Sequence, residues 1–337
     1  MSAADVPADP GQRRRLAPGP LPSLILRRLA LSGLSLFAVA TIVFWVMALL
    51  PGDAAERILG RDATPAALAA LRAQLHLADP LMERYLRWLR GMLAGDFGTS
   101  MAANRPAFPY IAGHLGNTLL LAGLALAVHI PLSIGLGLAG AAARRDGPFD
   151  TGLSVAVLIG MSVPEFVVGI GLVAWLATSW ALLPPLALID QAQSVGDFLR
   201  LTALPVITLN FAMTAYVVRQ TRASMIDVLR SDHVRAATLR GLSPARVLFF
   251  HALPGALPPA INAVALNAAW LVGGIVVVET VFNYPGLGRL LVESIGFHDV
   301  PMIQGAAIAL SATYIAVNLV ADIATLLLNP KLRTARS

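Results

Sequence analysis

The sequence contains no cysteine, only one lysine and few charged residues of any kind. The absence of cysteine excludes a disulfide framework and thiolate metal ligands. The one lysine, Lys331, follows Pro330, so the chain has no glycine-rich phosphate-binding loop ending in Gly-Lys-Ser or Gly-Lys-Thr. If ATP drives this protein, the ATPase must therefore be a separate polypeptide.

Signatures of catalysis are missing as well. The chain has neither a His-Glu-x-x-His zinc pair nor a Gly-x-Ser-x-Gly nucleophile, which argues against an intramembrane hydrolase. No cluster of His, Asp and Glu at metal spacing is visible. The arginines do not gather into a patch with aromatic residues, so nucleic acid is not an expected partner. We therefore predict no catalytic residue, no metal site and no enzyme activity.

Apolar residues, in contrast, make up 57% of the 337 positions, and charged residues only 13%. A soluble domain has roughly half apolar and a quarter charged residues. Several apolar stretches are long enough to cross a bilayer, which takes about 20 helical residues. They cover residues 29–50, 115–143, 151–182, 201–218, 259–278 and 302–321. The sequence therefore predicts an all-α membrane protein with six transmembrane helices, of which the third is long enough to tilt or break at Pro164.

The positions of the arginines predict the orientation of these spans. Most of the 25 arginine and lysine residues fall in segments that are cytoplasmic if the N-terminus is inside. Both termini are then cytoplasmic. The predicted organisation is a disordered cytoplasmic tail (1–23), a first transmembrane helix (24–50), an extracytoplasmic helical segment (51–113), a five-helix core (114–330) with a cytoplasmic loop (222–258), and a cytoplasmic tail (331–337).

The extracytoplasmic segment carries two helix-start signals. Thr64-Pro65 provides an N-cap followed by proline at the first helical position, and Leu68, Leu71 and Leu75 then repeat on one face. Asp79-Pro80 repeats the pattern before a second amphipathic stretch. We expect two short helices that lie against the outer membrane face or the helical bundle. The sequence does not distinguish whether these helices pack on the transmembrane helices or bind a partner.

The cytoplasmic loop, residues 222–258, has helix signals at both ends of its central part. Ser231 or Asp232 can cap a helix start, Gly241 suits a left-handed C-terminal stop, and Ser243-Pro244 supplies the next start. The pattern predicts a short helix, a sharp turn and a second helix. Ala236 and Ala237 are small, so the first helix can fit closely into a groove of another protein. An ordinary helix pair with no partner is the alternative.

This loop resembles the segment that docks a permease on its ATPase in binding-protein-dependent ABC importers. Peptide and nickel permeases usually carry a stretch similar to Asp-Tyr-Val-Arg-Thr-Ala-Arg-Ala-Lys-Gly-Leu-Ser. The chain keeps Asp232, Val234, Arg235, Ala237, Gly241, Leu242 and Ser243, and it departs at His233, Ala236, Thr238 and Leu239. Further similar stretches are Pro51-Gly52-Asp53, Gly95-Asp96-Phe97-Gly98-Thr99-Ser100, Ser162-Val163-Pro164, Glu279-Thr280-Val281-Phe282, Pro285-Gly286-Leu287-Gly288-Arg289 and Val317-Asn318-Leu319-Val320. Their shared order identifies the chain as a member of the dipeptide, oligopeptide and nickel permease family.

The resemblance implies a multi-pass permease subunit in the inner membrane of a prokaryote, importing di- or oligopeptides. Implied partners are a homologous second permease, giving a heterodimer, two ATPase subunits that use ATP and Mg²⁺, and an extracytoplasmic substrate-binding protein. This chain itself binds no cofactor. The ATPase-coupling residues are Asp232, Arg235, Ala236, Ala237, Gly241 and Leu242. Import of nickel or another small solute is an alternative. An ion-gradient-driven transporter would show repeated halves with broken helices, and no such symmetry is visible.

Polar residues within the spans are candidates for the translocation pathway. An ionised carboxylate inside a membrane is costly unless it faces protein, water or a counter-ion, so Glu165 is expected to face the bundle interior. There it could tune the pathway for cationic or amine-bearing solutes. Ser162, Pro164 and His129 are placed in the same pathway. A structural role is the alternative for both Glu165 and His129.

Two further polar groups lie near span ends. Glu279, Phe282, Pro285 and Gly286 form a candidate outer gate, with simple interfacial anchoring as the alternative. Asn318 and Asp322 are four residues apart on one helical face. They are suited to interhelical hydrogen bonds or to a metal clamp.

Overall fold

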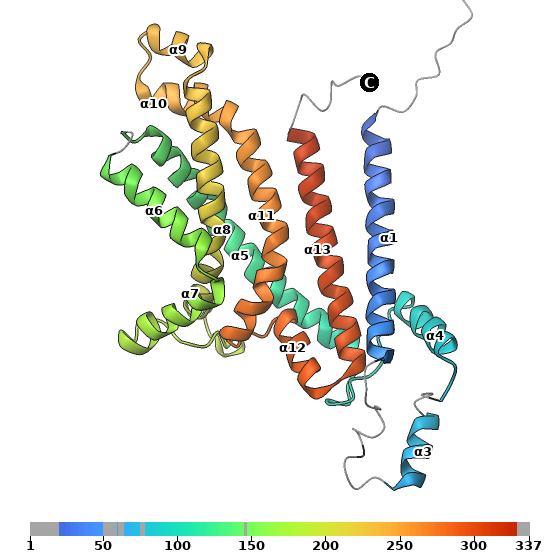
Figure 1. Cartoon of the computed structure of the whole chain (residues 1–337). Coiled ribbons are helices and arrows are strands. Elements are labelled where there is room, and N and C mark those ends of the chain that lie inside the picture. Colours follow the sequence, from blue (N-terminus) through green and yellow to red (C-terminus); the bar gives the residue numbers. More distant parts are fainter. Residues whose placement is uncertain (1–19, 50–58, 60–63, 75–77, 145–146, 329–337) are drawn as a thin grey trace, which may run out of the picture.

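The structure, a computed structural model, describes residues 20–49, 59, 64–74, 78–144 and 147–328 (Figure 1). Most of the predicted N-terminal tail, the Pro51-Gly52-Asp53 stretch, Leu75 and the tail at 331–337 lie outside the described residues. Within the described part, the chain is helical and has no strand beyond an isolated bridge between Thr99 and Pro106. The predicted all-α fold is confirmed.

Long helices form the body of the molecule, and shorter helices lie at its two ends (Figure 1). The elements are α1 (Pro20–Leu49), α3 (Pro65–Gln74), α4 (Leu81–Leu93), α5 (Ala107–Ala142), α6 (Pro148–Ser162), α7 (Glu165–Leu172) with its π-helical extension η1 (Val173–Ser179), η2 (Ile189–Gln191), α8 (Val195–Leu229), α9 (Asp232–Leu239), α10 (Pro244–Arg246), the π-helical η3 (Val247–Ala252), α11 (Leu253–Val281), α12 (Leu287–Phe297) and α13 (Val300–Leu328).

Five of these helical segments are long and apolar enough to cross a membrane by themselves. The sixth candidate span is a pair, Pro148–Ser162 and Glu165–Ser179, that bends by 107°. The bend lies at Pro164, where the preceding Val163 adopts an extended conformation (φ −89°, ψ 125°). Proline disfavours helical geometry in the residue before it, so the helix stops there. Of the two predicted alternatives, a tilt or a break at Pro164, the structure shows the break.

Several helix boundaries differ from the predicted ones. The first helix begins at Pro20, so residues 20–23 are helical and not part of a disordered tail. Helix α5 begins at Ala107, inside the segment predicted as extracytoplasmic. Helices α8 and α11 reach Leu229 and Leu253, which leaves only residues 230–252 of the cytoplasmic loop between them. The apolar stretches mark the part of a helix that suits the bilayer, and the helices continue into more polar sequence beyond it.

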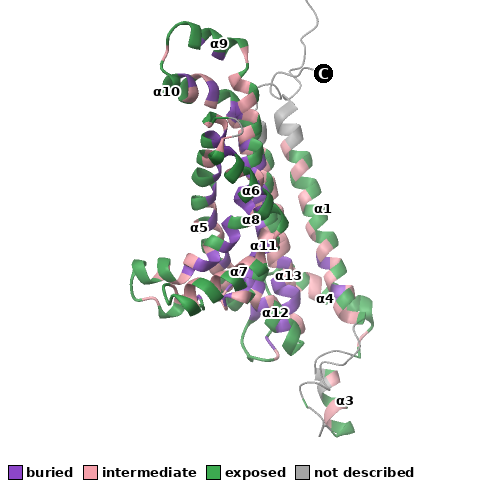
Figure 2. Ribbon diagram, turned by 60° about the vertical axis from the view of Figure 1, so that its left-hand side comes forward, coloured by how far each residue is buried: buried purple, intermediate pink, exposed green. Residues whose placement is uncertain are grey.

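The core lies where α5, α8 and α11 meet, as the buried residues in Figure 2 show. In α8, 61% of the most apolar window is buried, compared with 11% in α1. The central cluster includes Leu121 of α5, Leu209 of α8 and Ile275 of α11. Helix α1 packs on α13 at the edge, and its exposed leucines suit contact with lipid.

The two ends of the bundle carry different short helices (Figure 1). At one end lie α9 and α10, together with the beginning of α1 and the end of α13. Helices α3, α4, α7 and α12 lie at the other end. This arrangement agrees with a cytoplasmic loop on the same side as the beginning of α1 and the end of α13. The assignment of each end to a side of the membrane stays a prediction.

The predicted pair of short helices after α1 is present. Thr64 caps α3, with the Ala67 amide 3.3 Å from its hydroxyl oxygen. The prediction for α4 is wrong in detail, because Pro80 occupies the N-cap position and Asp79 instead pairs with Arg87 at 2.6 Å. Helix α4 packs against α1, where the Tyr85 hydroxyl lies 2.9 Å from that of Thr41.

Candidate functional site

The loop predicted to be cytoplasmic, residues 222–258, has the predicted helix, turn and helix. Helix α9 ends at Leu239, Gly241 adopts a left-handed conformation (φ +77°), and α10 starts at Pro244. A left-handed φ favours glycine because other residues place a Cβ in steric conflict. Ser231 occupies the N-cap position, but its hydroxyl donates to the Val228 carbonyl at 2.5 Å and does not cap α9.

The two alanines of α9 point in different directions. Ala237 is buried, together with Val234, in a cluster that includes Met225 of α8 and Val247 of η3. Ala236 is exposed. The expectation that both small residues fit into a partner's groove is therefore wrong for Ala237, whose small size instead lets α9 pack on its own chain.

The exposed surface of the loop contains most of the predicted coupling residues. Asp232, Arg235, Ala236 and Gly241 are exposed, and Leu242 is half-buried. Sequence reasoning missed Leu239, whose side chain is 81% exposed at the end of α9. An apolar side chain presented this way beside a left-handed turn is a further candidate contact for a partner. The departure from the family pattern at position 239 was the feature of the sequence that could have pointed to Leu239.

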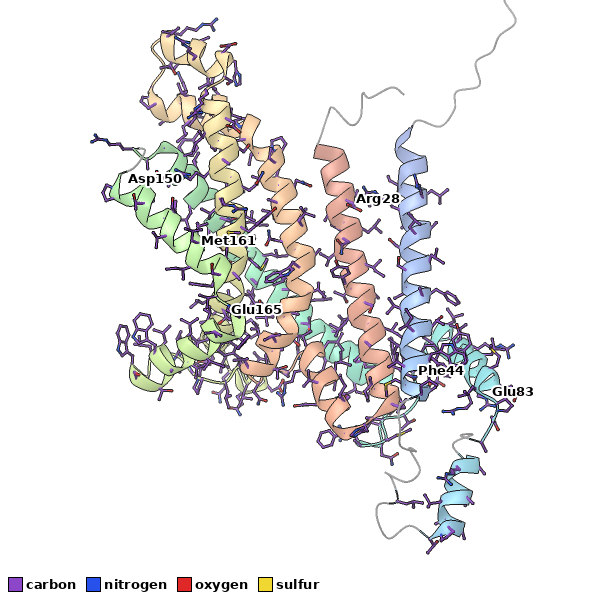
Figure 3. All side chains as sticks on the ribbon, viewed as in Figure 1. Arg28, Phe44, Glu83, Asp150, Met161 and Glu165 are labelled. Atoms are coloured by element: carbon purple, nitrogen blue, oxygen red, sulfur yellow. The ribbon has the colours of Figure 1, made fainter. Side chains whose placement is uncertain are left out.

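Three of the predicted pathway residues line one cavity of about 610 Å³. Ser162, Pro164 and Glu165 border it at the bend between α6 and α7, and α8 and α11 form the other walls. Figure 3 places Glu165 between the two ends of the bundle, just past Met161. Its carboxylate lies over Gly274 of α11, where a Cβ would be 2.6 Å from Oε2.

His129 does not line this cavity. Its side chain is fully buried, with Nδ1 3.3 Å from the hydroxyl of Thr214 on α8. Its Nε2 has no hydrogen-bond partner among the described residues. The position joins α5 to α8, which fits the structural alternative.

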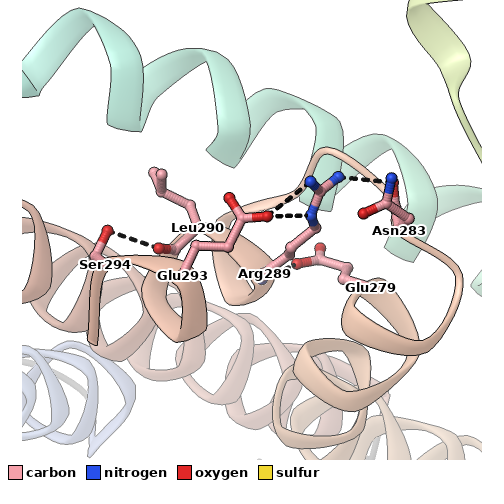
Figure 4. Close-up of polar contacts among 6 residues, drawn as sticks. All are labelled: Glu279, Asn283, Arg289, Leu290, Glu293 and Ser294. Atoms are coloured by element: carbon pink, nitrogen blue, oxygen red, sulfur yellow. Dashed lines mark hydrogen bonds and ion pairs between the residues drawn. The ribbon is translucent and has the colours of Figure 1, made fainter. Parts of the chain in front are cut away.

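The four predicted gate residues lie together at the end of α11 and the turn into α12. The carboxylate of Glu279 is fully buried. It accepts hydrogen bonds from the Thr118 hydroxyl (2.6 Å) and from the backbone amides of Gly288 (2.7 Å) and Arg289 (3.1 Å). Glu279 thus satisfies backbone donors in the first turn of α12 that have no partner within the helix. Figure 4 shows the neighbouring Arg289 side chain held between the Asn283 carbonyl and Glu293.

Further hydrogen bonds attach this turn to α5. The Tyr284 hydroxyl donates to the Asn117 carbonyl, and the Asn117 amide donates to the Pro285 carbonyl, both at 2.8 Å. The Leu287 amide donates to the Thr118 hydroxyl at 2.7 Å. The sequence analysis did not predict that α5 holds this turn. The consecutive polar residues Asn117 and Thr118 within an apolar stretch could have indicated it. The prediction that this turn acts as an outer gate, which would require it to open and close, stays a prediction.

Asn318 and Asp322 have separate partners. Asp322 forms an ion pair with Arg28, which connects α13 to α1. Asn318 donates to the Tyr314 carbonyl of its own helix at 2.9 Å. The described residues contain no group of three or more His, Cys, Asp or Glu that could hold a metal ion. The interhelical interaction is confirmed for Asp322, and the metal clamp has no support.

Comparison with known proteins identifies the family. Residues 129–334 match the family described as binding-protein-dependent transport system inner membrane component, and residues 21–118 match its N-terminal counterpart. A Sinorhizobium fredii protein named as a probable peptide ABC transporter permease is 35% identical over 309 residues, which cover 92% of this chain and 98% of that protein. The glutathione transport system permease protein of Salmonella paratyphi A is 36% identical, with the same coverage of both chains.

A solved amino acid ABC transporter, 19% identical in sequence, superposes on 66% of this chain and 94% of its own with a TM-score of 0.49. The sequence matches, by contrast, extend over nearly the whole chain and nearly the whole of each relative. They confirm the resemblance indicated by the loop and the ordered short stretches. The chain therefore belongs to the family of inner-membrane components of binding-protein-dependent transport systems.

Proposed function

We propose that this chain is the permease subunit through which an ABC importer moves di- or oligopeptides across the inner membrane. The observation that carries the proposal is the near full-length similarity to two permeases named for peptide and glutathione transport. Glutathione is itself a small peptide, so both names describe one class of solute. In this family the permease is the non-catalytic membrane component, and ATP hydrolysis belongs to partner ATPases.

The cytoplasmic loop is the proposed docking surface for an ATPase subunit. Its exposed residues include a carboxylate, a guanidinium and apolar atoms, from Asp232, Arg235, Ala236 and Leu239. Packing of Val234 and Ala237 on the chain's own helices joins α9 to α8 and η3. Movement of a docked ATPase, which binds ATP with Mg²⁺, would therefore be transmitted to the long helices.

A homologous second permease is proposed to cover the face that carries the 610 Å³ cavity. Phe166 and Leu266, which border it, are exposed. A second bundle packed on these side chains would turn the cavity into part of a path between two chains. We place the substrate-binding protein at the opposite end of the molecule from the cytoplasmic loop, where α12 and its turn lie (Figure 1).

Uptake by vesicles that contain the complete transporter tests the choice of solute. A labelled dipeptide should accumulate, and excess unlabelled dipeptide should reduce its initial rate at least about tenfold, whereas excess Ni²⁺ should leave it unchanged. The expectation follows because competing solutes share one site and unrelated ions do not. Accumulation of labelled nickel with no uptake of the dipeptide would contradict the proposal.

A further inference from the structure

The cavity beside the α6–α7 bend is bordered by the carboxyl group of Glu165. The Oε2 atom of Glu165 is buried and has no hydrogen-bond partner among the described residues. No arginine or histidine of the described chain forms an ion pair with it. A carboxylate in such a position is costly unless a positive group or water compensates it. When ionised, Glu165 is therefore expected to recruit water or a positive group into the cavity.

The other walls of the cavity offer what a positively charged group needs. Trp270 and Tyr216 contribute aromatic side chains, and aromatic faces attract cations. The Asn267 amide nitrogen donates one of its two N–H groups to the Ala263 carbonyl at 3.0 Å, and the amide oxygen is available as an acceptor. The Ser162 hydroxyl, whose proton goes to the Leu158 carbonyl at 2.8 Å, can likewise accept. The cavity thus offers acceptors from the Glu165 carboxyl group, the Asn267 amide oxygen and the Ser162 hydroxyl.

The chemistry of these walls favours an organic ammonium over a metal ion. An ammonium has three hydrogen-bond donors and no acceptor, so one carboxylate, an amide oxygen and a hydroxyl satisfy it. Calcium requires six to eight oxygen ligands, and nickel or zinc favours imidazole and other nitrogen or sulfur ligands. The cavity lining contains a single carboxylate and no histidine.

The backbone opposite Glu165 is shaped to admit the carboxylate. Gly274 lies within α11, where any residue can adopt the helical backbone conformation, so the backbone does not require glycine at this position. A Cβ at this position would be 2.6 Å from Oε2 and 2.9 Å from Oε1 of Glu165. Glycine thus provides room for the carboxylate at the cavity wall.

We propose that Glu165, with Trp270, Tyr216 and Asn267, forms a binding site for the ammonium group of the transported solute. The inference rests on the proposed import function, because the free N-terminus of a peptide is such an ammonium. The site lies between the turn that connects α11 to α12 and the cytoplasmic loop, so a solute that crosses the membrane along this face would pass it. Discrimination for a free amino terminus would then take place within the permease itself.

Protection of a cysteine in the cavity tests this site without the binding protein. The chain has no cysteine of its own, so Met161→Cys, at an exposed position of the cavity lining that the proposed site does not use, introduces its only thiol. In the assembled complex with cysteine-free partner subunits, alanyl-alanine should slow thiol labelling at a concentration about tenfold lower than N-acetyl-alanyl-alanine. A factor of ten corresponds to about 1.4 kcal/mol. Acetylation removes the positive charge and leaves the remaining peptide.

Glu165→Gln in the same background should abolish this preference for the free amine. The matched control is Glu83→Gln, which removes an exposed carboxylate on α4, far from the cavity, and should keep the tenfold difference. Trp270→Leu, which leaves Glu165 in place, should reduce the preference about threefold. If the Glu165→Gln protein fails to assemble, the Trp270→Leu protein still tests whether the cavity binds the ammonium group. Equal protection by both peptides in the Met161→Cys protein, or an unchanged preference in either cavity variant, would overturn the proposal.

Uptake of alanyl-alanine by the unmodified transporter separates this inference from the proposed function. Normal uptake combined with equal protection by the two peptides would leave peptide import standing and remove the ammonium site. A lack of uptake of any peptide would instead contradict the import function.

Discussion

Glu279→Ala is expected to destabilise the protein by about 3 kcal/mol or more. The substitution leaves the Thr118 hydroxyl and the amides of Gly288 and Arg289 without their buried acceptor. Each buried donor without a partner costs about 1–3 kcal/mol. The shortened side chain also leaves a cavity at the junction of α5, α11 and α12. The midpoint of thermal unfolding of the purified complex in detergent should therefore fall by several degrees.

Glu293→Ala provides the matched control for this prediction. Glu293 is a carboxylate on α12 that pairs with Arg289, but it is largely exposed, so its removal should cost less than about 1 kcal/mol. Gly288→Ala should resemble Glu279→Ala, because a Cβ at this position would be 2.6 Å from the Cα of Val276. Equal unfolding midpoints for Glu279→Ala and Glu293→Ala would show that the buried hydrogen bonds do not hold the turn.

Ala236→Glu should separate ATPase docking from folding. Ala236 is exposed on α9, so the variant should fold normally, whereas a larger charged side chain would obstruct a closely packed partner. We expect the amount of ATPase that co-purifies with the permease to fall at least about tenfold, equivalent to a loss of roughly 1.4 kcal/mol in binding. Hydrolysis stimulated by solute should fall with it.

Two further variants test whether the effect on ATPase binding depends on where the glutamate is introduced. Ala142→Glu places the same side chain at an exposed position at the end of α5 and should leave ATPase binding unchanged. Ala237→Glu places it within the apolar cluster around Met225 and should lower stability, because a buried unpaired charge is costly. Undiminished co-purification with Ala236→Glu would contradict docking through the exposed face of α9.

The features predicted correctly from the sequence are those set by local patterns. Long apolar stretches located the membrane helices, since a bilayer requires a fixed length of helix. Pro164 predicted the break between α6 and α7 because proline restricts the residue before it. Gly241 and Pro244 predicted the turn between α9 and α10 by the same kind of local rule.

The features that the sequence left open depend on contacts between distant segments. Glu279 could be named as a polar residue near the end of a span, but its donor Thr118 lies 161 residues earlier. Ala236 and Ala237 are identical side chains, and only the packing of α9 on α8 and η3 makes one exposed and the other buried. His129 was grouped with Glu165 as polar, yet its side chain contacts Thr214 of α8 and does not line the cavity.

The measurement that tests the central claim most directly is the energy dependence of dipeptide uptake. Vesicles should contain this chain, its second permease and the ATPases, with the binding protein added on the side opposite to the ATPases. An ATP-driven permease predicts uptake that requires ATP at the ATPases and continues when ion gradients are dissipated. Uptake that continues without ATP and stops when an ion gradient is removed would contradict the account.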